Sequence, residues 1–127
     1  MSTSPLSIAP SSGAVPELDP EQIAMLRGLR KGALLPQLLR TYKEQLPQQL
    51  AAIEAALAAG DVAAVGGVAH SLKSASYSIG AKRLGDLCAA IEAAARGGDA
   101  AAVGDGCGGL AGAWALLQPE IEGHLAS

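Results

Sequence analysis

The spacing of the apolar residues limits the possible folds of this chain more than any other feature. These residues recur every three or four positions through four long segments after residue 33. In an α-helix, this spacing places apolar side chains on one face. The first segment carries such a face, formed by Leu35, Leu39, Tyr42, Leu46, Leu50, Ile53 and Leu57. No segment alternates apolar and polar residues for long enough to predict a strand, so the pattern predicts an all-α fold.

Small residues supply much of the apolar content. The 127 residues include 27 alanines and 16 glycines, one Trp, two Tyr and no Phe. Alanine favours helices, and small side chains allow helices to pack closely. The length corresponds to one compact domain.

Two Gly-Asp pairs, Gly60-Asp61 and Gly98-Asp99, indicate tight turns between helices. Glycine can adopt the left-handed conformation after a helix, and aspartate can cap the helix that follows. With Gly80 as a further break, the predicted helices cover about 33–59, 62–79 and 81–96, and a last helix carries an apolar stripe from residue 103 to residue 125. We expect Pro47 to kink the first of these helices without dividing it.

The N-terminal part has a different character. Residues 1–17 are rich in Ser and Pro and are predicted to form a disordered tail, followed by a folded domain at 18–127. Asp19 is expected to cap a short first helix that ends near Gly32, and Gln22 is expected to complete a capping box. The predicted fold class is therefore all-α: an antiparallel four-helix bundle with a short additional N-terminal helix.

Composition excludes several classes of function. The net charge is -3 and the pI about 5.2, so the chain lacks the basic surface that binds nucleic acid or anionic lipid. No stretch of about 20 apolar residues is free of charge or glycine, which argues against a membrane span. Without a signal sequence, we expect a cytoplasmic monomer. Cys88 and Cys107 are expected to be free thiols on apolar faces, and no spacing indicates a metal site or a cofactor.

The helix predicted at 62–79 contains the most informative residues. Its buried stripe is formed by Val62, Val65, Ala69, Leu72, Ser76 and Ile79. His70 lies about 140° from the middle of this stripe and should face outward. The other residues expected on this outward face are Ala63, Gly66, Gly67, Lys73, Ser74 and Tyr77.

This face suggests a chemical role for His70. Two glycines inside a helix cost roughly 2 kcal/mol relative to alanine, and nothing about a bundle surface requires Gly66 and Gly67. A bare surface would let another protein's active site approach the imidazole, which is largely neutral and nucleophilic near pH 7. Lys73 should lie about 5 to 6 Å away by Cβ, where it could attract a phosphoryl group.

A longer pattern resembles a known family. Residues 69–76, Ala-His-Ser-Leu-Lys-Ser-Ala-Ser, continue with Ile-Gly-Ala at 79–81 and with Leu84, Cys88 and Glu92. This string resembles the signature of histidine-containing phosphotransfer (HPt) domains. The resemblance implies that His70 is the phosphorylated histidine and that Lys73 is the family's lysine one turn later. Ser74 departs from the pattern, because the family most often has glycine there.

The resemblance also implies partners. Family members relay a phosphoryl group between aspartates of receiver domains, often from a hybrid sensor histidine kinase to a response regulator, and have no nucleotide site. The receiver domain would supply the catalytic acidic residues and Mg²⁺. Glu92 and Arg96 match positions that lie near the phosphohistidine in some relatives, and their helical-wheel angles place them off the buried stripe. The docking surface would comprise Gly66, Gly67, Ser74, Tyr77, Glu92 and Arg96.

Two alternative functions belong to other classes of protein. One is a helical binding or adaptor module that keeps the bundle without phosphotransfer. The other is a nucleotide-dependent enzyme, since residues 104–109 contain the spacing Gly-x-Gly-x-x-Gly. That motif requires a preceding strand within a βαβ unit, and a helix start precedes it here, so nucleotide binding is not expected. His124 lacks companion groups and is expected to be incidental, and Trp114 is expected in the core.

Overall fold

The structure of the chain is a computed structural model that describes residues 16–126, without the side chains of residues 30 and 31. Most of the predicted tail, residues 1–15, lies outside the described residues, and its disorder stays a prediction. At the end of that segment the backbone N–H of Glu17 donates to Oε2 of Glu120 over 2.8 Å, and the N–H of Leu18 donates to Oε1 over 3.1 Å. One carboxylate on the last helix therefore fixes the entry of the chain into the bundle.

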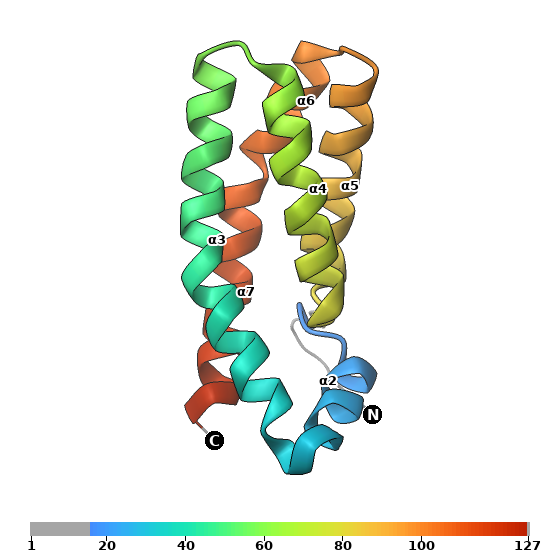
Figure 1. Ribbon diagram of the computed structural model, residues 1–127, viewed down its shortest axis with the longest axis vertical. Helices are drawn as coiled ribbons and strands as arrows, with labels where there is room; N and C mark the ends of the chain where they lie inside the picture. The colour runs from blue at the N-terminus through green and yellow to red at the C-terminus, as the bar shows by residue number, and fades with distance from the viewer. Residues whose placement is uncertain (1–15, 127) are drawn as a thin grey trace, which may run out of the picture.

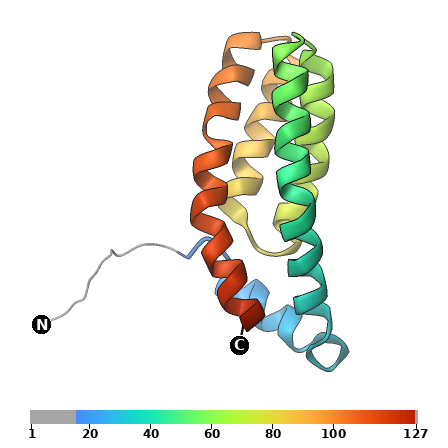
Figure 2. The same cartoon turned by 90° about the vertical axis from the view of Figure 1, so that its left-hand side faces the viewer.

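The described residues form an antiparallel bundle of four long helical segments with a short helix at one end (Figure 1). The elements in chain order are α2 (Pro20–Arg27), the 3-10 helix η1 (Leu29–Gly32), α3 (Leu34–Ala58), α4 (Val62–Ser78), α5 (Lys82–Arg96), α6 (Ala100–Gly108) and α7 (Leu110–Ala126). In the perpendicular view α2 lies across the lower end of the bundle (Figure 2). The described part of the chain contains no strand, and the predicted fold class is confirmed.

The turns between helices follow the expected chemistry. Gly60, Gly80 and Gly98 have φ values of 71°, 80° and 71°, in the left-handed region that glycine tolerates. The Asp61 side chain accepts a hydrogen bond from the N–H of Ala64 over 3.0 Å, and Asp99 caps α6 in the same way. These two caps satisfy helix N–H groups that have no intrahelical partner.

The cap of α2 differs from the prediction. Asp19 accepts from the N–H of Glu21 over 3.0 Å, but Gln22 does not complete a capping box. Instead, Nε2 of Gln22 donates to the carbonyl of Ser78 over 3.1 Å. The last carbonyls of a helix lack intrahelical donors, so Gln22 satisfies the end of α4 and ties α2 to the bundle.

The last helix is not continuous, which the spacing of its apolar residues did not predict. It is interrupted at Gly109, whose N–H bonds to the carbonyl of Gly106 over 3.1 Å. Gly106 itself has a packing reason, because an added Cβ there would lie 2.6 Å from Cγ1 of Ile91 on α5. By contrast, α3 passes through Pro47 as one helix, as expected.

One stretch, Ala100–Ala126, is long and apolar enough to span a membrane by length and composition, with a mean hydropathy of 1.2 over an 18-residue window. The stretch contains Asp105 and several glycines, so it does not contradict the expectation that no stretch of about 20 apolar residues is free of charge or glycine. In this fold the stretch is divided at Gly109, and it buries Val103, Leu117 and Ile121 in the bundle core. It therefore forms the fourth segment of the bundle.

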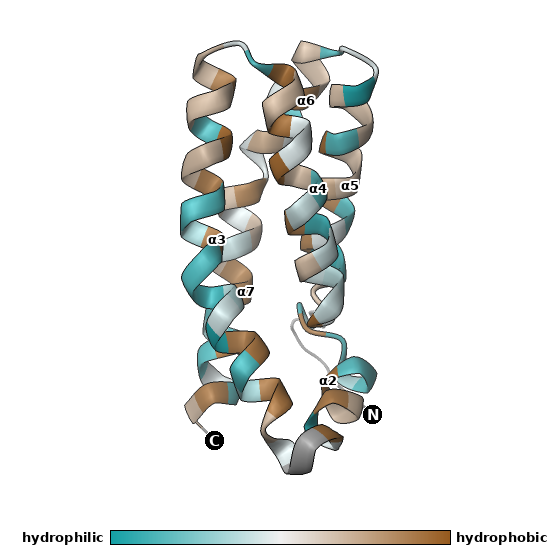
Figure 3. Cartoon of the chain, in the orientation of Figure 1, coloured by the Kyte–Doolittle hydropathy of each residue, from teal (hydrophilic) through white to brown (hydrophobic). Residues whose placement is uncertain are grey.

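The core is aliphatic, with one polar pair inside it. Leu39, Leu46, Val65 and Leu72 are buried among residues from the other helices. Within this core the hydroxyls of Tyr42 and Ser76 lie 2.8 Å apart and satisfy each other. In Figure 3 the lower half of α3 carries most of its hydrophilic residues, and its upper half is mainly hydrophobic.

Trp114 and Cys107 are less buried than the spacing of the apolar residues predicts. Trp114 is half-buried, with its ring centroid 6.2 Å from that of Tyr42. Both cysteines are free thiols, Cys88 buried and Cys107 half-buried. Burial raises the pKa of the Cys88 thiol to about 12, so it remains protonated at neutral pH.

Candidate functional site

His70 projects from the middle of α4 to the outside of the bundle. Its side chain is 61% exposed, whereas its neighbours Ala69 and Leu72 are fully buried. The helix phase that buries these neighbours turns the ring outward, as the helical wheel predicts. The imidazole is therefore accessible to another protein without any change in the fold.

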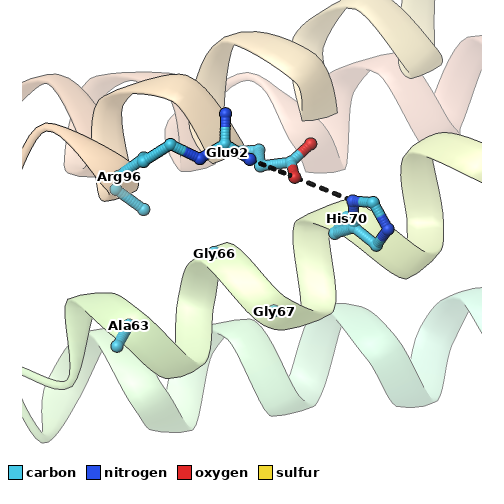
Figure 4. A pocket seen from close by; sticks show the side chains of 7 residues that line it. Ala63, Gly66, Gly67, His70, Glu92 and Arg96 are labelled. Carbon is cyan, nitrogen blue, oxygen red and sulfur yellow. Dashed lines mark hydrogen bonds and ion pairs between the residues drawn. The ribbon is translucent and has the colours of Figure 1, made fainter.

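The ring is held from α5 by Glu92. Nδ1 of His70 lies 2.7 Å from Oε2 of Glu92 (Figure 4). The Glu92 side chain is only 10% exposed and lies on the buried face of α5 with Cys88 and Ile91. The expectation that Glu92 lies off the buried stripe is wrong, because cationic partners compensate the cost of burying its charge.

Two cations hold the Glu92 carboxylate in addition to the imidazole. Nζ of Lys73 lies 2.7 Å from Oε1, and Nη2 of Arg96 lies 2.9 Å from Oε2. The pKa of Glu92 is lowered to about 2. The hydrogen bond from Lys73 is the largest cause, and the hydrogen bond from His70 is the second. Glu92 is thus ionised at neutral pH, and its position is fixed by groups on two helices.

The ionised carboxylate decides which ring nitrogen of His70 is nucleophilic. A carboxylate only accepts hydrogen bonds, so Nδ1 must donate and carry the hydrogen. In the neutral ring, Nε2 then keeps its lone pair. This tautomer follows from the hydrogen-bond partner, and it leaves Nε2 available as a nucleophile on an exposed ring.

Lys73 has a different immediate partner from the one expected. Its side chain is 28% exposed, and its ammonium pairs with Glu92 instead of extending freely beside the ring. The direct effect of Lys73 is to keep the carboxylate charged and oriented toward His70. Such an outer partner fixes the tautomer and orientation of the histidine, much as the groups behind a metal-bound histidine do.

The two glycines of α4 serve different purposes. A Cβ at Gly66 would lie 2.9 Å from Cβ of Ala95, so this glycine allows α4 and α5 to approach closely. The expectation that packing does not require Gly66 is wrong, because the sequence does not show how closely α4 and α5 approach each other. A Cβ at Gly67 would meet nothing within 4 Å, and this position is open to solvent.

A shallow pocket borders the imidazole between α4 and α5. It has a volume of about 540 Å³. Its lining consists of Ala63, Gly66, Gly67, His70, Glu92, Ala95 and Arg96 (Figure 4). Four of these seven residues are Ala or Gly, so little bulk stands beside the ring.

Tyr77 and Ser74 occupy the next turns of the same face. Tyr77 is 40% exposed, and its hydroxyl donates to Oδ1 of Asp86 over 2.6 Å. Its ring covers Gly85, where a side chain would collide with it. Ser74 is exposed, and its carbonyl accepts from the hydroxyl of Ser78 over 2.9 Å. Asp86 and Gly85 were not foreseen as partners of Tyr77.

The site is built from a nucleophile and its supporting charges rather than from metal ligands. Within residues 16–126, no group of three or more His, Cys, Asp or Glu side chains is placed to hold a metal ion. The residues brought together from the predicted set are His70, Lys73, Glu92 and Arg96, with the small residues of the pocket beside them.

Comparisons with known proteins bear on this arrangement. The family model described as "Hpt domain" matches residues 37–123, a range that includes His70 and Glu92. The crystal structure of histidine-containing phosphotransfer protein B (HptB) from Pseudomonas aeruginosa PAO1 is similar, with a TM-score of 0.83 and 27% sequence identity. The match covers 89% of this chain and 97% of that one. A comparison with curated protein sequences finds no match.

Proposed function

The chain belongs to the Hpt domain family, and we propose that it carries its phosphoryl group on Nε2 of His70. It is a histidine phosphotransfer protein of a phosphorelay, a phosphocarrier rather than an enzyme. One observation carries the assignment to His70: the ring is exposed, and its Nδ1 is bonded to an ionised carboxylate 2.7 Å away. That contact reserves the lone pair of Nε2 for the incoming phosphorus.

The chain contributes a positioned nucleophile to the transfer. Phosphoryl transfer depends mainly on in-line positioning and on stabilising charge, with little covalent work for the carrier. Glu92 orients the imidazole, and Lys73 and Arg96 keep Glu92 in place and add positive charge near the phosphate. The partner receiver domain supplies the acidic residues and Mg²⁺.

The exposed faces of α4 and α5 form the docking surface in this proposal. Gly67 and Ser74 leave space beside the ring, and Tyr77 offers a half-exposed aromatic ring further along α4. Residues 62–96 carry four cationic and two acidic side chains, although the whole chain has a net charge of -3. Lys82 and Arg83 pair with Asp19 and Glu17, so the cations left beside the ring are Lys73 and Arg96, which would face an acidic receiver site.

The partners follow from the same proposal. They are receiver domains of a hybrid sensor histidine kinase and of a response regulator, and the protein acts in the cytoplasm as a monomer. The family membership and the open ring favour this carrier function over a bundle that serves only as an adaptor.

A phosphodonor assay tests the acceptor residue. After incubation with phosphoramidate, the wild type should acquire an acid-labile, alkali-stable phosphate. His70→Gln should remain at background, and His124→Gln, the matched control, should label like the wild type. Labelling that persists in folded His70→Gln would contradict the assignment.

A further inference from the structure

Lys and Arg residues are distributed unevenly along the chain. Residues 22–43 contain five of the nine and no Asp or Glu: Arg27, Arg30, Lys31, Arg40 and Lys43. The rest of the chain contains four Lys or Arg residues and all twelve Asp and Glu residues. The net charge of -3 is therefore an average over a cationic segment and an acidic remainder, and it does not describe the surface that residues 22–43 form.

The cationic segment forms one end of the molecule. In both views the turn between α2 and α3 is the lower extremity of the bundle (Figure 1, Figure 2). Arg27 is the last residue of α2 and is exposed, and Arg30 and Lys31 belong to η1 in the turn itself. Arg40 is exposed near the start of α3. The cations that are close in sequence are thus also close in space, and we call this region the basic end.

Charged groups from other elements neutralise only part of the basic end. Nζ of Lys43 lies 3.2 Å from Oε2 of Glu122 on α7, and Glu44 follows Lys43 on α3. Arg27 instead bonds to Nδ1 of His124, a side chain that brings no negative charge. The excess positive charge therefore lies at the turn between α2 and α3.

Two large apolar side chains are exposed among these cations. Met25 is 54% exposed and Leu29 is 44% exposed, whereas Ile23 and Leu26 already provide the buried face of α2. The backbone at Gly28 has φ -79° and ψ -11°, so the chain stays helical between the exposed pair, and their four-residue spacing places them on one side. Cations that flank exposed apolar side chains are typical of surfaces that bind anionic bilayers, where Lys and Arg contact headgroups and the apolar groups enter the acyl boundary.

We propose that the basic end binds the surface of an anionic lipid bilayer, with Met25 and Leu29 inserted at the level of the headgroups. A bilayer can contact a protruding end without a groove. An acidic protein segment would pair with the cations, but it would not account for the exposed apolar pair. The family model begins at residue 37, so both apolar residues lie outside the matched part of the chain.

This binding is additional to phosphotransfer and does not rest on it. The basic end lies beyond the C-terminal end of α4 (Figure 1), whereas His70 projects from the middle of that helix. A bilayer at the basic end therefore leaves the α4–α5 face open to a receiver domain. The carrier would be held at a membrane surface while its imidazole stays accessible.

Sedimentation of the full chain with lipid vesicles tests the charge requirement. We expect binding to vesicles of two parts phosphatidylcholine and one part phosphatidylglycerol, weakened by salt, and no binding to phosphatidylcholine alone. Each cation near such a surface contributes about fivefold to binding, so the double variant Arg30→Gln, Lys31→Gln should bind about 25-fold more weakly. The matched control Lys82→Gln, Arg83→Gln changes the net charge equally at the start of α5 and should bind like the wild type.

A second pair of variants tests the apolar requirement at constant charge. The double variant Met25→Ser, Leu29→Ser should bind the anionic vesicles about tenfold more weakly, because less apolar surface enters the bilayer. The matched control Leu116→Ser, at a position 53% exposed on α7, should bind like the wild type. Circular dichroism checks that each variant is folded, and phosphoramidate labelling of His70 should be the same in all of them.

Four results would overturn the proposal. The first is that folded wild type fails to bind anionic vesicles, and the second is that it binds both kinds of vesicle equally. The third is an equal loss of binding in the two charge variants, which would assign the effect to overall charge. The fourth is binding to soluble polyglutamate as tight as to vesicles, with no effect of Met25→Ser, Leu29→Ser, which would identify an acidic polypeptide as the partner.

Discussion

The two histidines of this chain lie in opposite electrostatic settings. His70, on the α4–α5 face, has a carboxylate 2.7 Å from Nδ1, whereas His124, near the end of α7, has the guanidinium of Arg27 3.0 Å from Nδ1. A guanidinium only donates, so Nδ1 of His124 accepts, and Nε2 carries the hydrogen when the ring is neutral. The same side chain is therefore a prepared nucleophile at one place and not at the other.

The largest effect is expected when His70 receives a cationic neighbour like that of His124. Glu92→Arg places a cation where the carboxylate accepts the Nδ1 hydrogen, which should favour the wrong tautomer. We expect phosphoramidate labelling of His70 to slow by about 10²–10⁴-fold, the range for losing an orienting carboxylate or a general base. Labelling rates by mass spectrometry, with circular dichroism as the check on folding, measure the effect.

A labelling rate for folded Glu92→Arg within a factor of two of the wild type would contradict this role of Glu92. The converse change, Arg27→Glu, places a carboxylate near His124. That variant should leave His70 labelling unchanged, because Arg27 contacts α7 and not the site.

Substitutions at the two glycines on α4 separate the effect of helix packing from the effect of access to His70. Gly66→Ala would force its Cβ against Ala95, and we expect a loss of about 1–3 kcal/mol in the free energy of unfolding. Gly67→Leu meets no neighbouring atom, so its stability should match or exceed that of the wild type. Transfer to a receiver domain should nevertheless slow in Gly67→Leu, because the added side chain stands beside His70. Equal transfer rates in Gly67→Leu and wild type would show that the receiver does not approach over this turn.

A smaller effect should appear in the pH dependence of stability. The folded pKa of Glu92 is about 2, below its ordinary value of 4.5, so the unfolded state binds the proton more readily between these values. The contribution of Glu92 is fully present above pH 4.5 and is lost as the pH falls toward 2. Urea unfolding at pH 7, 5 and 3 should show the wild type losing more stability than Glu92→Gln below pH 4.5. Parallel pH profiles for the two proteins would contradict the lowered pKa.

Local features of the sequence account for much of this structure. The turns at Gly60 and Gly98 with their capping aspartates, and the outward direction of His70, depend on residues within one or two turns of helix. The apolar spacing likewise predicts the four segments, because each helix must bury one face. Residues near one another along the chain carry these signals.

Features that depend on the distance between helices were not predictable in the same way. Glu92 pairs with His70, 22 residues earlier in the chain. The family resemblance implied that Glu92 lies near this histidine, but not that its side chain is buried, because a helical wheel treats an unpaired charge as a surface residue. Its position four residues after buried Cys88 was the available signal. Gly66 and Gly106 are required by atoms of α5, and Gln22 bonds to the end of α4, so only the packed structure explains them.

The central claim is that the Glu92 carboxylate selects Nε2 of His70 as the phosphoryl acceptor. Correlation of the phosphorus-31 signal with the ring protons of phosphorylated, nitrogen-15-labelled protein identifies both the residue and the nitrogen that carries the phosphate. The account predicts a single phosphate, on Nε2 of His70. A phosphate on Nδ1 of His70, or on His124, would contradict it.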